Sequence, residues 1–157
     1  IAAFIAALNV AALAIRYPEA DAITSWQPQR EGGDRSLIGL KDENGVFMDR
    51  IPLNILQGDV TRVDHTVFGL MVIKTSSLIR MPKPWFRSAP NAEGEWEDGK
   101  VDADGYFWDK WGKTGLTIYV ANNVKIGHLF EGILWVDSNF NLIQQRLPDF
   151  YEKGRPF

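Results

Sequence analysis

The first fifteen residues repeat apolar side chains at the spacing of one face of a helix. The side chains on this stripe are Ile1, Ile5, Leu8, Ala12 and Ile15. Alanine fills most of the other positions, and such small side chains allow a helix to approach a sheet closely. Pro18 lacks the backbone N–H that a longer helix would need. The pattern therefore predicts a helix over residues 1–15 that packs on a β-sheet.

Several short runs of β-branched and other apolar residues predict strands. They cover residues 21–26, 58–63, 66–74, 116–120 and 132–137. The run at 66–74 is nearly all apolar, which is typical of a central strand that is buried on both faces. Two further runs, 36–40 and 46–49, flank Asn44 and Gly45. Because an Asn-Gly pair favours a tight turn, we expect a hairpin there.

A short aromatic helix is predicted to begin at about Asp104 and to end before Gly115. Phe107 and Trp111 lie four positions apart with Trp108 beside them, so one face is apolar while charged side chains face water. Gly115 follows at the position where a left-handed residue commonly ends a helix. The aromatic face of this helix is therefore expected to pack on the sheet.

The remaining segments indicate a loop and a short C-terminal helix. Residues 87–99 have no periodicity and many Gly, Pro and acidic residues, which indicates a mobile surface loop able to act as a lid. Residues 142–146 are expected to be helical. Strands outnumber helices, and we predict an α/β fold, a mixed sheet with flanking helices and some antiparallel pairs, in a single domain of residues 1–157.

Composition and charge narrow the possible functions. The net charge is -3 and the pI is about 5.4, so there is no electrostatic reason to expect a nucleic-acid partner. The sequence has no cysteine, which excludes disulfides and thiolate metal sites. The apolar N-terminal run is shorter than the roughly 20 residues of a membrane span and lacks the features of a signal peptide. We therefore expect no membrane span and a cytoplasmic location.

Residues 101–129 hold the best candidate for chemistry in the chain. The predicted helix and the strand at 116–120 return Asp104 and His128 toward the same end of a sheet, where a carboxylate and an imidazole would meet. The alternatives are that Asp104 only caps the helix and that His128 is a structural residue. His65 has no chemically suggestive neighbour in the sequence and is interpreted as structural.

The segment VDADGYFWDKWGKTGLTIYVANNVKIGHL, residues 101–129, resembles a known family. It is similar to the Glu-Asp-x-x-Phe helix, Gly, Tyr-Val strand and Gly-His segment of nucleotide-sugar-dependent glycosyltransferases with the GT-A fold. Upstream, VFGLMVIKTSSL resembles the family's Gly-containing strand and short helix, and MPKPWF resembles the Pro-Trp-Phe before its acceptor loop. YPEADAITSWQPQR resembles the strand after the metal-binding strand. The pieces stand in the family's order over about residues 1–130.

The resemblance implies a partial GT-A (nucleotide-diphospho-sugar transferase) fold of the inverting, family-2-like type. The implied reaction transfers a sugar from a nucleotide-sugar donor to a carbohydrate or other hydroxyl acceptor. Asp104 matches the Asp that takes the acceptor's proton, because the attacking oxygen must lose its proton as it reaches the anomeric carbon. Ala103 stands where the family usually has Glu, and Asp102 is the candidate replacement for that carboxylate.

The resemblance also implies a metal ion. His128 matches a His that in some members joins Asp-x-Asp carboxylates around Mn²⁺ or Mg²⁺, and neutral imidazole suits Mn²⁺. However, no Asp-x-Asp stands at a strand end before the first helix, and the nucleotide-binding half of the family's fold is missing. We therefore expect the C-terminal, acceptor-side part of a longer glycosyltransferase catalytic domain. A sheet edge left exposed without that half favours a homo-oligomer.

Three further residues are candidates for substrate contacts. Trp85 and Trp96 offer aromatic faces that suit sugar rings, and Gly69 allows backbone to approach a ligand or a neighbouring strand. Core packing is the alternative for Trp85 and its neighbour Phe86. Trp96 lies in the polar loop and is therefore the better candidate for ligand contact.

Two other functions remain open on the sequence alone. The chain could be a non-catalytic module that keeps this half-fold for binding carbohydrate or for oligomerisation. It could also be a small α/β protein whose likeness to glycosyltransferases is accidental. An Asp-x-Asp half encoded upstream would select the transferase, whereas a start codon just before Ile1 would favour the binding module.

Overall fold

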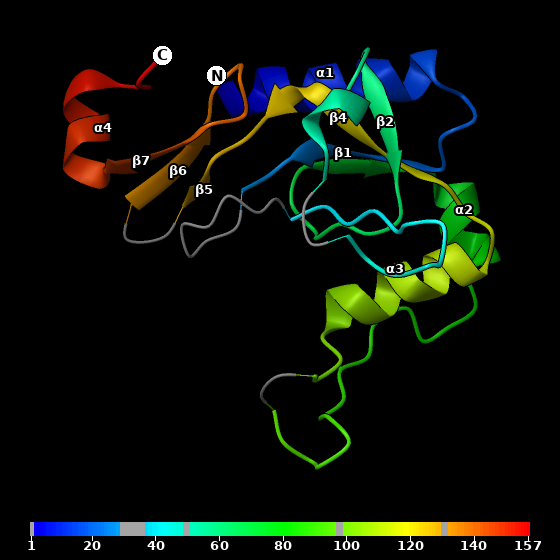
Figure 1. The fold of residues 1–157 in the computed structure, drawn as a ribbon. Helices are drawn as coiled ribbons and strands as arrows, with labels where there is room; N and C mark the ends of the chain where they lie inside the picture. The colour runs from blue at the N-terminus through cyan, green and yellow to red at the C-terminus, as the bar shows by residue number, and fades with distance from the viewer. Residues whose placement is uncertain (1, 29–36, 49–50, 97–98, 130–131) are drawn as a thin grey trace.

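A computed structural model describes residues 2–28, 37–48, 51–96, 99–129 and 132–157 (Figure 1). Its helices are α1 (Ala2–Arg16), α2 (Thr75–Arg80), α3 (Ala103–Lys113) and α4 (Leu147–Lys153), with a 3-10 turn at Leu53–Ile55. Its strands are β1 (Ala22–Trp26), β2 (Val60–Val63), β3 (Met71–Ile73), β4 (Ile118–Lys125), β5 (His128–Leu129), β6 (Gly132–Val136) and β7 (Leu142–Arg146). The predicted α/β class, a mixed sheet with flanking helices, is confirmed.

The larger sheet has four strands in the order β2-β4-β1-β3. β1 and β4 are parallel and central, while β2 and β3 pair antiparallel at the two edges. The prediction of a central strand at 66–74 is therefore wrong, because only Met71–Ile73 pairs and it forms an edge. The other apolar residues of that run serve different packing, as Phe68 does in a ring cluster on α3.

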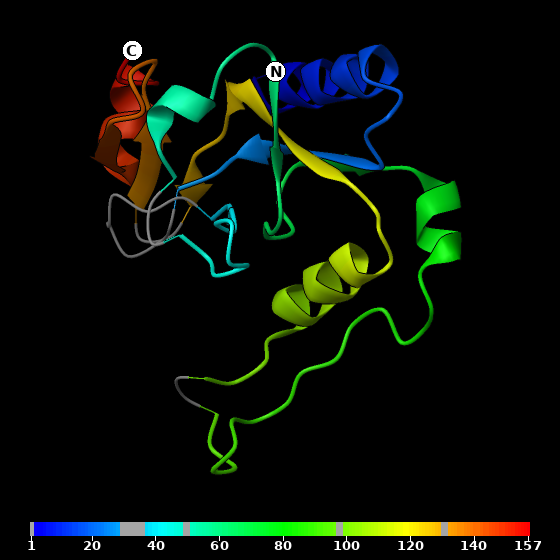
Figure 2. The ribbon, with the colours of Figure 1, turned by 45° about the vertical axis from the view of Figure 1, so that its right-hand side comes forward.

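Helices α1 and α3 cover opposite faces of this sheet, as both ribbon views show (Figures 1 and 2). Alternating side chains of the central strands enter different cores: Ile118 and Val120 pack in the core with α3, whereas Tyr119 and Ala121 pack with α1. Every residue of β1 is buried. A strand covered on both faces needs apolar or small residues at every position, which explains the sequence AITSW.

Helix α1 lies on β1, β3 and β4, as the pattern predicts, but its orientation differs from the prediction. Val10 is fully buried and Ala6, Leu13 and Ala14 pack around it, whereas Ile15 of the expected stripe is 83% exposed. The stripe prediction is wrong because apolar residues surround the helix, so periodicity did not single out one face. The small side chains of the buried face allow the close approach to the sheet.

Helix α3 has the predicted position and ends. Asp102 is its N-cap, and Gly115 adopts a left-handed φ of 73° just after its last turn. Phe107, Trp108 and Trp111 are buried and form the centre of the core on this side of the sheet. Burying each such aromatic side chain stabilises the fold by about 1.5–3 kcal/mol, so this helix is firmly anchored.

A second, three-stranded sheet has the order β5-β6-β7. The helix predicted at 142–146 is wrong, because this segment is strand β7 and pairs with β6 along its whole length. The turn between the strands explains the pairing: the Asp137 carboxylate accepts the backbone N–H groups of Asn139 and Asn141. The helical turn begins only at Leu147, where Pro148 fits the first turn.

Two further segments lie below and beside the large sheet. The predicted hairpin around Gly45 is present, with Lys41 pairing Phe47, although neither side forms a longer strand. Ala89 and Val101 pair in a bridge, and the described residues between them, 90–96 and 99–100, extend away beyond α3 as an arm (Figure 2). None of the helices in the described ranges is long and apolar enough to cross a membrane.

Candidate functional site

The first turn of α3 separates two acidic residues into different roles. Asp102, at the N-cap, accepts the backbone N–H of Gly105 at 2.5 Å through Oδ1. Asp104 lies inside the helix, and its Oδ2 accepts the backbone N–H of Phe68 at 3.3 Å. The capping role that was the alternative for Asp104 is therefore filled by Asp102. Among the described residues, the Oδ1 atom of Asp104 has no hydrogen-bond partner.

The N–H group that holds Asp104 is fixed by aromatic packing. The Phe68 ring stacks on Trp108 with centroids 5.2 Å apart and meets the edge of Phe107 at 4.8 Å. Phe86 completes the cluster, lying 5.1 Å from Phe68 and stacked 5.0 Å from Phe107. These contacts tie the segment before β3 to α3, so the position of the Asp104 carboxylate follows from the packing.

His65 is the imidazole that the structure brings to these carboxylates. It pairs through its backbone with Gly39, and its ring meets Phe47 edge to face at 5.9 Å. Burial lowers the pKa of His65, while Asp102 and Asp104 raise it and Lys41 lowers it; the net direction is downward. The imidazole is therefore neutral at pH 7, where each ring nitrogen has a distinct hydrogen-bonding role.

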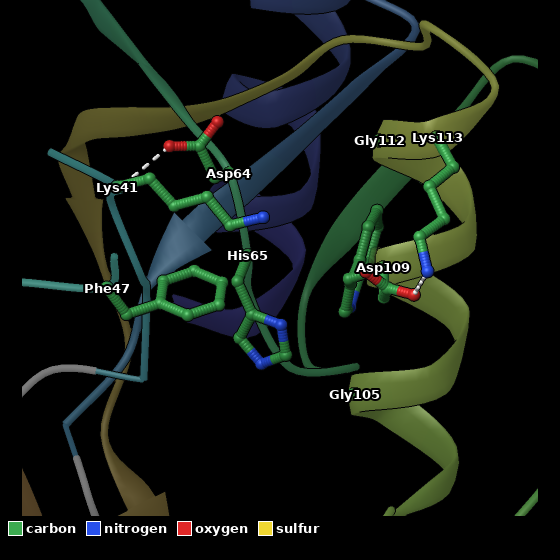
Figure 3. Close-up of a pocket in the computed structure, with 9 residues that line it drawn as sticks. Lys41, Phe47, Asp64, His65, Gly105, Asp109, Gly112 and Lys113 are labelled. Carbon is green, nitrogen blue, oxygen red and sulfur yellow. Dashed lines mark hydrogen bonds and ion pairs between the residues drawn. The ribbon is translucent and has the colours of Figure 1, made fainter. Parts of the chain in front are cut away.

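A pocket of about 410 Å³ separates His65 from α3 (Figure 3). In the close-up, Lys41, Phe47 and His65 form one wall and the residues of α3 form the other. The residues that line it are Lys41, Phe47, Asp64, His65, Gly105, Trp108, Asp109, Gly112 and Lys113. Its volume lies within the usual range for small-molecule sites.

The α3 wall of the pocket is built around two glycines. The lining residues of α3 recur every three or four positions, which places them on one face of the helix; they include Gly105, Trp108, Asp109 and Gly112. A Cβ added at Gly112 would meet no atom within 4 Å. Glycine inside a helix is less favourable than alanine by about 1 kcal/mol, and packing against the protein does not account for this one.

The same wall holds a buried donor without a partner. Trp108 is fully buried, and its indole N–H has no hydrogen-bond acceptor in the part of the chain that the structure describes. Leaving a buried donor unpaired costs about 1–3 kcal/mol. By contrast, the neighbouring Trp111 donates its indole N–H to the Thr117 carbonyl oxygen at 3.2 Å. Of the two tryptophans of α3, only the one that lines the pocket therefore has an unpaired indole N–H.

His128 lies in β5, where its backbone pairs with Leu134 of the smaller sheet. Asp104 belongs to α3, under the larger sheet. The side chain of His128 lies outside what the structure describes, so a shared cleft between these two residues stays a prediction. Within the described ranges, no group of three His, Asp or Glu side chains is placed to hold a metal ion. The expected Mn²⁺ or Mg²⁺ therefore also stays a prediction.

The other candidate residues have defined surroundings. Trp85 packs on the core and donates its indole N–H to the Met81 carbonyl oxygen at 3.0 Å, as expected for a structural residue. Trp96 is 59% exposed on the arm. A Cβ at Gly69 would lie 2.0 Å from the side-chain nitrogen of Gln27, so this glycine is needed for close packing on a buried amide. Contact of Trp96 with a ligand stays a prediction.

Comparisons with known proteins extend only to the fold. No protein-family model and no curated protein matches this sequence. Among solved structures, the chain is similar to the crystal structure of the viral protein A197 from STIV, with a TM-score of 0.53 and 17% sequence identity. The match covers 87% of this chain but 58% of the other. At this identity the likeness shows the α/β fold alone.

Sequence reasoning missed the pocket and His65. Three segments build the site: the hairpin around Lys41, the residues after β2, and α3. Their approach depends on the Gly39–His65 bridge and on a backbone contact from Lys41 to the Asp64 carboxylate at 2.7 Å. Neither contact has a local sequence signal. The two glycines in an otherwise aromatic helix were the one visible clue.

Proposed function

We propose that this chain is the acceptor-side part of a glycosyltransferase with a GT-A arrangement. Asp104 is its general base and takes the proton of the acceptor hydroxyl as that oxygen attacks the anomeric carbon of a nucleotide-sugar. The observation that carries the proposal is the Asp104 carboxylate, which is held by one backbone N–H and keeps its second oxygen unpaired among the described residues. A base needs such an oxygen to receive a proton.

The arrangement of elements supports the proposal. The sequence pieces that resemble the family correspond to β1, β3 with α2, and α3 with β4, in that order. β1 and β4 run parallel and adjacent at the centre of the sheet. Helix α3, which carries Asp104, directly precedes β4 in the chain. The loop that joins α3 to β4 contains Gly115 and is short, so the position of α3 is set by the sheet.

The two carboxylates of this turn have different parts in the proposal. Asp102 caps the helix and thereby holds Asp104 in the first turn, so it is a positioning residue. Ala103 stands where the glycosyltransferase family usually has Glu, so no acidic residue directly precedes Asp104. No step is assigned to a metal ion, because the described residues do not assemble a site for one.

The test is a transfer assay on the natural full-length protein. Release of nucleoside diphosphate is measured with a panel of nucleotide-sugars, with and without oligosaccharide acceptors. We expect Asp104→Asn to lower the rate of transfer by about 10²–10⁴-fold while the thermal unfolding curve is unchanged, because general base catalysis contributes that much. Transfer at the wild-type rate by Asp104→Asn would overturn the assignment.

Asp102→Ala is the matched control. Removing an N-cap side chain costs about 1 kcal/mol of stability, so this variant should unfold at a lower temperature. Its transfer rate, measured well below that temperature, should fall far less than that of Asp104→Asn. Equal losses in the two variants would mean that Asp104 acts only through the structure of the turn.

A non-catalytic carbohydrate-binding module is the second candidate. The observation that favours it is the pocket, whose wall carries Phe47 and His65, together with the exposed Trp96 on the arm. A binding module would retain glycan without releasing nucleoside diphosphate from any donor. Such a result, with unaltered binding in Asp104→Asn, would favour this function over transfer.

A further inference from the structure

We propose that the pocket between α3 and the Lys41–Phe47 hairpin binds one neutral sugar residue. Identifying this residue as part of the acceptor rests on the proposed function. The binding itself does not, because it is argued from the pocket walls and is measured without a nucleotide-sugar donor.

The α3 wall leaves space that a ligand would fill. Gly105 and Gly112 expose the helix backbone to the pocket, and a Cβ at Gly112 would meet only open space. A helix keeps such glycines at a cost to its own stability. Close approach of a ligand to the helix is a physical reason for that cost, because a larger side chain would occupy the ligand's volume.

Charges of both signs surround this space. Lys41 and Lys113 supply ammonium groups, while Asp64 and Asp109 supply carboxylates; Lys113 and Asp109 pair with each other at 2.6 Å. An anionic ligand would meet the two carboxylates, and a cationic ligand would meet the two ammonium groups. Each hydroxyl of a neutral sugar both donates and accepts, so it can pair with groups of either sign.

Lys41 and Asp64, on the wall that faces α3, also match hydroxyl partners. The Lys41 side chain extends across the pocket, 5.0 Å from the centroid of the Phe47 ring (Figure 3). Asp64 uses one carboxylate oxygen for the backbone of Lys41 and has the other oxygen available in the described structure.

Phe47 gives the pocket an aromatic surface on which the apolar face of a sugar ring can pack. Phe47 is 51% exposed although it contacts His65, so part of its ring faces outward. The C–H faces of a pyranose pack favourably on such a ring. A hydrophobic metabolite would use the ring but leave the Lys41 ammonium group and the second Asp64 oxygen without hydrogen-bond partners among the described residues. The combination therefore favours a sugar.

The position of the pocket connects it to the candidate base. Gly105 lines the pocket and directly follows Asp104 in the first turn of α3. Asp104 is also close enough to His65, on the facing wall, to raise its pKa. A sugar held here lies beside the base, as an acceptor residue next to the reacting hydroxyl would.

The test is a titration of the ¹⁵N-labelled chain, followed by NMR. Neutral methyl glycosides of glucose, galactose and mannose are the probes, and glucuronate and glucosamine are the charged comparators. We expect at least one neutral glycoside to shift the Gly105 and Gly112 amide signals and the Trp108 indole signal along one saturable curve. Signals that stay unshifted with every neutral glycoside, or a preference for a charged comparator, would overturn the proposal.

Variants locate the binding. Gly112→Leu fills the pocket and should weaken binding by about tenfold or more, while Glu152→Leu, a matched change on the exposed face of α4, should not. Phe47→Ala removes an exposed ring and should also weaken binding, which keeps the test decisive if Gly112→Leu does not fold. Wild-type affinity in a folded pocket variant would exclude this site.

The same titration separates the two proposals. Asp104→Asn should still bind the glycoside saturably, since Asp104 is not among the residues that line the pocket. Saturable binding by a protein that never transfers sugar would leave the pocket standing and remove the transferase. Transfer that depends on Asp104 but is unaffected by Gly112→Leu, in both KM and kcat, would remove the pocket and leave the transferase.

Discussion

Helices α1 and α3 cover opposite faces of one sheet, yet they are built on different principles. α1 is apolar over most of its surface and exposes Phe4, Ile5 and Leu8 to solvent, although only its opposite face packs on the sheet. α3 buries three large aromatic residues and leaves charges and glycines on the remaining surface. The comparison shows that candidate chemistry gathers on the helix with spare polar surface, while the helix with spare apolar surface is suited to contacts with other protein.

The largest expected difference between the two helices is in their contribution to stability. Trp111→Ala should lower the free energy of unfolding by about 3–5 kcal/mol, because it leaves a large cavity and removes the hydrogen bond from the indole to the Thr117 carbonyl. Val10→Ala, at the centre of the α1 contact, should cost about 2 kcal/mol. Urea unfolding of the two variants measures both values. A larger loss for Val10→Ala would mean that α1 is the main anchor of the sheet.

The contrast between the helices also explains what the sequence predicted well. α3 was placed correctly because its pattern has one apolar face and distinct end signals at Asp102 and Gly115. α1 was found as a helix, but its buried face was assigned wrongly because apolar residues occur all round it. Periodicity identifies a face only where polar residues mark the other side.

Longer-range features of the fold could not be predicted from local patterns. Strand β3 occupies an edge although its run is apolar, since its residues also serve the Phe68 ring cluster. The local sequence of residues 142–146 predicted a helix, but the segment forms β7, because the turn at Asp137 places it beside β6. Of the candidate site, the position of Asp104 at the start of α3 was predicted, whereas the approach of His65 depended on distant pairing.

A second prediction concerns the glycines on the polar side of α3. Gly112→Ala should raise the free energy of unfolding by about 1 kcal/mol, because alanine favours the helix and its Cβ meets no atom. Gly105→Ala should gain less, since its Cβ would lie 3.1 Å from the Asp102 carboxylate oxygen. Thermal unfolding compares the two. Destabilisation by Gly112→Ala would show that this glycine has a structural role the packing does not reveal.

A third prediction concerns the surplus apolar face of α1. Changing Leu8 and Ile15 to Gln should alter the free energy of unfolding by only about 0.5 kcal/mol each, because both side chains are exposed. We expect the parent chain to self-associate through this face and the double variant to be more monomeric. Light scattering over a range of concentrations measures this, with Glu152→Gln as a surface control. A monomeric parent at high concentration would contradict the expected homo-oligomer.

The smallest expected effect is the pH dependence that His65 contributes. Burial is the main cause that lowers the pKa of His65 in the folded state below the unfolded value of about 6.5. At a pH between these two pKa values, the unfolded chain therefore binds more protons than the folded chain. The stability that follows is present above about pH 6.5 and is lost as the pH falls through the pKa of the folded state. The carboxylates with lowered pKa values, such as Asp21, lose their contribution only at lower pH, since their usual value is 3.8.

The chain has only two histidines, so the window from about pH 7.5 to 5.5 isolates them. His65→Gln should flatten the decline of the urea midpoint across this window, because Gln keeps hydrogen-bonding capacity without titrating. His128→Gln serves as the matched control and should leave that part of the slope in place. If the urea midpoints of His65→Gln and the parent decline alike, the pKa of the imidazole is the same in the folded and unfolded states. That result would mean that Asp102 and Asp104 fully offset the effect of burial on the pKa of His65.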